Sequence, residues 1–167
     1  MPEKRTMERA RRDKAEGKAP STQAGEFVRE EIDHIREGKH GARSARQAIA
    51  IGLSKARKAG VDLPPPKEGT TSSATRKSAK RAYEQGQGKA PKRRTSPRRS
   101  RATKAALKRE GSAAGSKSAL ARQGRAAAKR RTPASRSAAS RRASQTKGPR
   151  RRSAAAKKAA RTRAGAT

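Results

Sequence analysis

Histidine and carboxylate residues are the first candidates for chemistry, and the chain has only two histidines. Glu31 and His34 form a Glu-x-x-His pair, the spacing with which helices of di-iron carboxylate bundles hold metal ions. Such a site needs two of these motifs, whereas this sequence has one, so we expect His34 to be a surface histidine beside acidic residues. His40 stands in a glycine-flanked segment, where we expect a turn residue or a phosphate contact.

Other reactive groups are equally sparse. The chain has no cysteine, which excludes disulfides and thiolate zinc sites. No nucleophile–base pair and no glycine-rich loop after a strand is recognisable. The sequence therefore predicts no metal site, no cofactor and no catalytic residue, and we do not expect an enzyme.

Lysine and arginine give the strongest chemical signal. The chain has 47 of them against 13 acidic residues, a formal net charge of +34. Residues 67–167 hold 32 of the basic residues but only three acidic ones. A segment of this charge repels itself and attracts polyanions, so we expect nucleic acid as the partner. We favour double-stranded DNA over RNA, because RNA readers stack bases on aromatic side chains and this region offers only Tyr83.

The residues expected to contact DNA lie in basic runs of this region, where they would bind phosphates rather than read bases. They are Arg76, Lys77, Lys80, Arg81, Lys92, Arg93, Arg94, Arg98, Arg99, Arg101, Lys104, Lys108, Arg109, Lys117, Arg122, Arg125, Lys129, Arg130, Arg131, Arg141, Arg142, Arg150, Arg151, Arg152, Lys157, Lys158, Arg161 and Arg163.

The elements that position these residues begin with a small helical head. Residues 1–20 predict one exposed helix, and residues 21–63 predict a helical hairpin with helices over 21–37 and 44–59. Ser44 and Gln47 have the capping-box spacing at the start of the second hairpin helix. Apolar residues at helical spacing predict the hairpin core: Phe27, Val28, Ile32, Ile35, Ile49 and Leu53. A hairpin of this size is near the lower limit for independent folding, so a homodimer through the hairpin is an alternative.

One face of the first hairpin helix is acidic. It is formed by Glu26, Glu30, Asp33 and Glu37, opposite the apolar face. We expect a solvated surface there. A weaker alternative is that it holds part of the basic region when no DNA is bound.

Beyond the head, the chain predicts a mostly α protein with little packed structure. Three prolines open a proline-rich linker over residues 64–72, and residues 73–167 form a low-complexity basic tail. Its helix-prone segments, among them 134–146 and 152–163, are separated by glycine and proline. Short helices with clustered positive charge are marginal in water, so we expect a largely disordered tail that becomes helical on DNA.

A membrane role is not expected, because no apolar run approaches the roughly 18 residues of a membrane span. The first residues also lack the apolar stretch of a signal peptide. We therefore expect a cytoplasmic protein located at the nucleoid.

Four segments carry a resemblance to a known family: GEFVREE at 25–31, HIREGKHGARS at 34–44, QAIAIGLSKARKAGV at 47–61 and ATRKSAKRAYE at 74–84. They resemble a bacterial family of small basic proteins with a domain of unknown function, often labelled DNA-binding. The tail is similar in composition to the tails of linker histones, and residues 95–99 (TSPRR) resemble their Ser-Pro-basic turns. The resemblance implies a nucleoid-associated protein and supplies no catalytic residue.

The function expected from these observations is sequence-nonspecific, histone-like DNA binding in which the tail neutralises backbone phosphates. Two alternatives stay open. One is an RNA- or ribosome-associated basic protein, and the other is a helical protein-interaction module with a solubilising basic tail.

Overall fold

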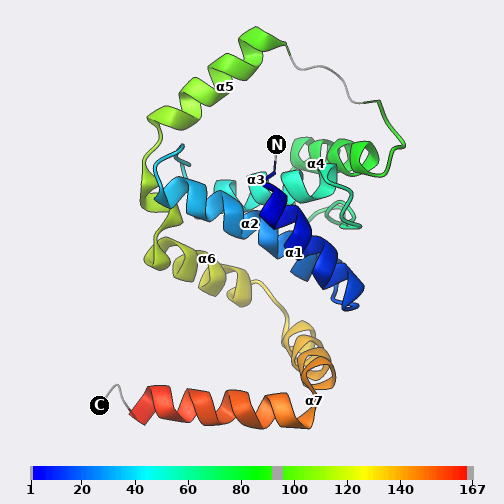
Figure 1. The fold of residues 1–167 in the computed structure, drawn as a ribbon, viewed down its shortest axis with the longest axis vertical. Helices are drawn as coiled ribbons and strands as arrows, with labels where there is room; N and C mark the ends of the chain where they lie inside the picture. The colour runs from blue at the N-terminus through cyan, green and yellow to red at the C-terminus, as the bar shows by residue number, and fades with distance from the viewer. Residues whose placement is uncertain (1, 92–95, 165–167) are drawn as a thin grey trace. The chain divides into compact units, whose positions relative to one another are not determined.

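The computed structural model describes residues 2–91 and 96–164, and these residues form helices and no strand (Figure 1). The chain divides into two compact units between Gln123 and Gly124, and each is described by itself. The elements are α1 (Lys4–Ala15), α2 (Pro20–Arg36), α3 (Ala45–Lys58), α4 (Ser73–Gly86), α5 (Pro97–Arg109), the 3-10 helix η1 (Ser112–Gly115), α6 (Lys117–Lys129) and α7 (Pro133–Ala164).

Helices α2 and α3 pack against each other and form the centre of the first unit. Helix α1 lies on α2, and α4 lies on α3. One core cluster contains Phe27 with Ala10, Ala24, Ala56 and Val61. A second contains Ile35, Ala42, Ala48 and Ala114. Of the predicted hairpin core, Phe27 and Ile35 are fully buried, and the other four residues are half-buried: Val28, Ile32, Ile49 and Leu53.

The ends of α2 and α3 explain how the chain reverses direction. Gly38 and Gly60 follow these helices with φ values of 71° and 90°, a region that residues with a Cβ rarely adopt. The next amide donates back into the helix, from Lys39 to His34 and from Val61 to Ala56. This is the Schellman arrangement, which satisfies the last carbonyl groups of a helix. The loop after Gly38 leads to His40, and the segment after Gly60 leads into the prolines.

The start of α3 confirms the predicted capping box. The Ser44 hydroxyl accepts a hydrogen bond from the Gln47 amide at 3.2 Å. The Gln47 side chain accepts in turn from the backbone amide of Arg43, one residue earlier than the motif predicts.

The prediction that residues 73–167 are largely disordered is wrong, and α4 is the first correction. The Ser72 hydroxyl caps this helix by accepting from the Thr75 amide at 3.3 Å. Ala79 and Ala82 are buried on its α3-facing side. The Tyr83 hydroxyl donates to Asp62 at 2.6 Å, so a polar contact also joins α4 to the segment after α3.

The end of α5 and the 3-10 helix η1 are the second correction. The amide of Gly41 donates to the Leu107 carbonyl at 2.9 Å, and the Arg36 guanidinium donates to the Gly115 carbonyl at 2.8 Å. Ala114 is buried beside Ile35. The number of large apolar residues did not predict this packing, because it is made by backbone groups, alanine and glycine.

Buried Arg57 organises the proline-rich segment. Its side chain is 7% exposed and donates to the carbonyls of Leu63 and Pro64 at 3.1 and 3.3 Å. Removal from water disfavours the charged form and lowers the pKa of Arg57 from its ordinary value. This residue holds the chain where it leaves α3.

The second unit contains the end of α6 and the 32-residue helix α7. Helix α7 runs through both segments that were predicted as separate helices and includes Pro149. A proline inside a helix leaves one backbone hydrogen bond unmade. The high helix propensity of the alanine, lysine and arginine residues around it favours continuation.

Docking of α4 can be tested through Tyr83, the only tyrosine in the chain. Its hydrogen bond to Asp62 raises the pKa of Tyr83 above the ordinary value of about 10. A raised pKa of this acid favours the protonated folded form, so the stabilisation is complete below about pH 10. It is lost as the pH rises through the folded-state pKa. We expect Asp62→Asn to move the pKa back toward the ordinary value, measured by the ultraviolet absorbance of tyrosinate.

Asp33→Asn is the matched control, because Asp33 pairs with Arg36 and does not contact Tyr83. If Tyr83 of the wild type has the ordinary tyrosine pKa, and Asp62→Asn does not change that pKa, then α4 is not docked.

Candidate functional site

A basic surface lies on α4, opposite the side that packs on α3. Four basic side chains are exposed there: Arg76, Lys77, Lys80 and Arg81. At 100° per residue they occupy one side of the helix, and Ala79 and Ala82 occupy the other. Arg76 lies 3.3 Å from Glu68, and Lys80 lies 3.8 Å from Glu84. Exposed pairs of this kind contribute little, so phosphates can replace the carboxylates.

Helices α5 and α6 continue this pattern. The half-buried residues of α5 include Ser100 and Leu107, seven positions apart on one side. Its basic residues are all exposed: Arg98, Arg99, Arg101, Lys104, Lys108 and Arg109. On α6, Arg122, Arg125 and Lys129 share one exposed side at spacings of three and four residues, while Leu120 is half-buried on another. We call Arg122, Arg125 and Lys129 the α6 basic row.

The remaining predicted contacts lie around α6 and along α7. Those with a described side chain are also exposed: Lys117, Arg130, Arg131, Arg141, Arg142, Lys157 and Arg161. The side chains of Arg150, Arg151, Arg152, Lys158 and Arg163 are not among those described, and Lys92, Arg93 and Arg94 lie outside the described residues. The predicted contacts with a described side chain thus lie on exposed sides of the helices of each unit.

The segment that resembles a histone turn starts a helix here. Ser96 is the N-cap residue of α5 and Pro97 is in its first turn, where the missing amide costs nothing. Thr95 lies outside the described residues. Arg98 and Arg99 are therefore displayed by a helix and not by an extended turn.

The acidic residues of α2 are less solvated than the sequence indicated. Glu30 is 5% exposed and pairs with Lys55 on α3, while Glu26 pairs with Arg9 on α1. Asp33 and Glu37 pair with their neighbours Arg36 and Lys39. All these partners belong to the first 66 residues. The acidic face joins the helices of the head.

These contacts also remove cations from α3 that could have read DNA bases. Lys55 is engaged by Glu30 and Glu31, and Arg57 is buried. Arg46 and Lys58 are the exposed cations of this helix. Two cations at opposite ends of the helix are a weak basis for a recognition helix.

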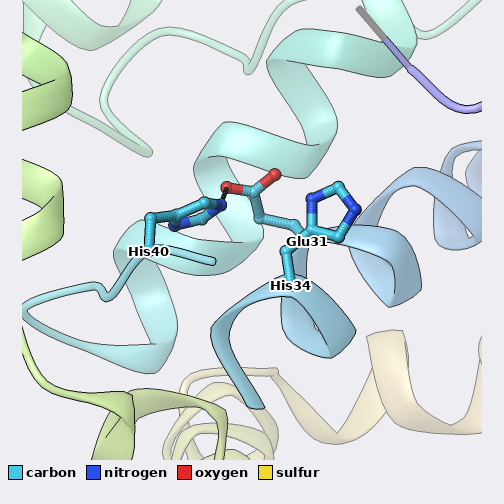
Figure 2. A group of neighbouring side chains, drawn as sticks. All are labelled: Glu31, His34 and His40. Atoms are coloured by element: carbon cyan, nitrogen blue, oxygen red, sulfur yellow. Dashed lines mark ion pairs between the residues drawn. The ribbon is translucent and has the colours of Figure 1, made fainter. Parts of the chain in front are cut away.

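A cluster of different chemistry lies where α2 ends. Glu31 and His34, one turn apart on α2, meet His40 from the following loop, and the Glu31 carboxylate lies between the two imidazole rings (Figure 2). One ligand atom from each residue lies within 4.8 Å of the other two. Glu31 is 1% exposed, and the two rings are half-buried and edge-on at 6.1 Å. The sequence pointed to Glu31 and His34 as a pair but did not predict that His40 lies beside them. His40 reaches the pair because the chain reverses direction at Gly38.

Glu3, just before α1, completes the surroundings of this cluster. Its carboxylate lies 2.8 Å from Nε2 of His34 and 3.6 Å from the Lys39 ammonium. The hydrogen bond from His34 is the main cause that lowers the pKa of Glu3, and the charge of Lys39 adds to it. Glu3 therefore stays ionised beside the histidine.

Comparison with known proteins covers the head. A model of a family of unknown function (DUF6496) matches residues 4–67, which contain α1, α2 and α3. No curated protein and no solved structure matches the chain. Within the described residues, none of the helices has the length and apolar character needed to cross a membrane.

Proposed function

We propose that this protein binds double-stranded DNA without sequence preference, through phosphate contacts made by the basic helices that follow residue 66. The observation that carries the proposal is the exposure of the basic side chains on α4, α5 and α6. On α4 they lie opposite the side that packs on α3. Three acidic residues cannot neutralise the 32 basic residues of this region, so a polyanion is needed to compensate the charge.

The mechanism is counterion release. DNA carries one charge per about 1.7 Å of its axis together with condensed cations, and each bound lysine or arginine displaces some of those cations. Helices formed before binding hold the cations at fixed spacing, so less conformational entropy is lost than in a chain that orders on DNA. Among the described residues, no helix presents a converging group of polar side chains that could read bases. This favours binding to the phosphate backbone of DNA over recognition of its bases.

A histone-like or nucleoid-associated role follows from this mode of binding. Several basic helices on one chain can contact different stretches of duplex and draw them together. RNA is the alternative polyanion, and the near absence of aromatic residues (one Phe, one Tyr, no Trp) argues against specific single-strand binding. We place the protein in the cytoplasm, at the nucleoid.

The α6 basic row gives a direct test. Arg122→Gln, Arg125→Gln and Lys129→Gln together remove three charges and keep good helix formers in place. Each lost phosphate contact makes the slope of log affinity against log salt shallower by about 0.9. The slope of the triple variant should therefore be shallower than that of the wild type by up to about 2.7. We expect its affinity for a duplex at 0.1 M salt to fall at least tenfold, measured by fluorescence anisotropy.

The matched control removes three charges from the head, through Lys14→Gln, Arg46→Gln and Lys58→Gln. These side chains are exposed, and their loss gives the same net charge as the α6 variant. If duplex affinity fell equally in both variants, it would depend only on the total charge of the chain. A greater loss for the head variant would contradict the proposal, and tighter binding to structured RNA than to DNA at matched salt would replace DNA with RNA.

A further inference from the structure

We propose that Glu31, His34 and His40 form a binding site for a single Zn²⁺ ion in the head. None of the three residues belongs to the proposed DNA-binding surface, since all of them lie before residue 66. The structure supports it by hydrogen-bond direction, burial and anchoring of the backbone.

The first support is the direction in which the imidazole lone pairs point. A carboxylate or carbonyl oxygen can only accept, so Nε2 of His34 donates to Glu3, and Nδ1 of His40 donates to the Gly41 carbonyl at 3.1 Å. In the neutral rings the remaining nitrogens, Nδ1 of His34 and Nε2 of His40, therefore carry lone pairs.

The second support is what these lone pairs face. Nε2 of His40 lies 3.2 Å from Oε1 of Glu31, so with a neutral ring two acceptors face each other, and either a proton on Nε2 or a metal ion has to lie between them. A metal ion satisfies all three ligand atoms at once. Zinc favours imidazole nitrogen and carboxylate oxygen at about 2.0–2.2 Å, which separates tetrahedral ligands by about 3.3 Å. The three ligand atoms now lie within 4.8 Å of one another, so they have to move closer together when the ion binds.

The third support is the state of the Glu31 carboxylate. Among the described residues, Glu31 is a carboxylate that is only 1% exposed, and its Oε2 pairs with the Lys55 ammonium. Lys55 is shared with Glu30, so two buried carboxylates face one lysine. A divalent cation would compensate the remaining negative charge.

The backbone around the cluster is anchored on both sides of His40. Glu31 and His34 are held by α2, and the amides of Gly41 and Ala42 donate to the carbonyls of Leu107 and Gly111. Glu3 contacts the outer nitrogen of His34, as carboxylates do behind the histidine ligands of metal sites. Three protein ligands leave a fourth position for water.

Zinc titration of the untagged, full-length protein tests the site. We expect one Zn²⁺ per chain by isothermal titration calorimetry. Because His34 and His40 are the only histidines, long-range ¹H–¹⁵N spectra should show both imidazoles shifting together at one equivalent. This readout needs no variant, so it does not depend on whether a substituted chain folds.

Substitutions then assign the ligands. His40→Gln should weaken zinc binding by about 100-fold, and Glu3→Gln, which removes a positioning residue, by about tenfold. Glu16→Gln is the control, because it removes an exposed carboxylate that pairs with Lys18 and contacts no residue of the cluster. The zinc affinity of this variant should equal that of the wild type. Absence of binding, movement of one imidazole alone, or wild-type affinity in His40→Gln would each overturn the site.

Discussion

Replacing Gly52 by alanine should destabilise the head by about 1–3 kcal/mol, the usual cost of overpacking a closed core. A Cβ at this position of α3 would lie 2.6 Å from Cα of Val28 and 3.0 Å from the Phe27 carbonyl oxygen. Both are backbone atoms of α2 and cannot rotate away, so the two central helices must separate. The change is measured as a lower urea midpoint, followed through Tyr83 fluorescence and circular dichroism.

Gly25→Ala is the matched control within the same helix pair. Gly25 lies inside α2 with no atom within 4 Å of an added Cβ. Alanine exceeds glycine in helix propensity by about 1 kcal/mol, so this variant should be as stable as the wild type or more stable. Equal stabilisation in both variants would show that α2 and α3 do not approach as closely as described.

Removing α7 should produce the largest change in DNA binding. A chain that ends at Thr132 lacks 11 basic residues and no acidic one, so its net charge falls from +34 to +23. The first unit ends at Gln123, and its contacts are retained. Each phosphate contact contributes about eightfold to affinity at 0.1 M salt, so the loss of three or more contacts should weaken duplex binding by over 100-fold.

Fold and function can be separated in this variant. The urea midpoint followed through Tyr83 should match that of the full chain, because Tyr83 contacts Asp62 in the first unit. Wild-type DNA affinity in a chain without α7 would move the interface to α4–α6 or to the head.

The sequence was informative where local signals act. Ser44 and Gln47 predicted the start of α3, and the spacing of Phe27 and Ile35 identified the two largest fully buried apolar side chains of α2. Caps and amphipathic spacing depend on residues within one or two turns, so the order of nearby residues is sufficient to predict them.

The sequence was misleading where distant segments meet. Docking of the end of α5 depends on the Gly41 amide and the Leu107 carbonyl, and almost every residue carries such groups. Composition alone could not distinguish Ala114, which is buried, from the many exposed alanines of the same region. The cluster of Glu31, His34 and His40 was missed for the same reason, since His40 approaches Glu31 only after the chain reverses at Gly38.

The salt dependence of duplex binding tests the central claim most directly. For the full chain, log affinity should fall linearly with log salt at a slope near −9, as about ten phosphate contacts require. Two duplexes of unrelated sequence should give the same affinity and the same slope, and the chain that ends at Thr132 should give a slope shallower by about 3 or more. A slope near zero, or an affinity that differs strongly between the two duplexes, would contradict binding through the phosphate backbone.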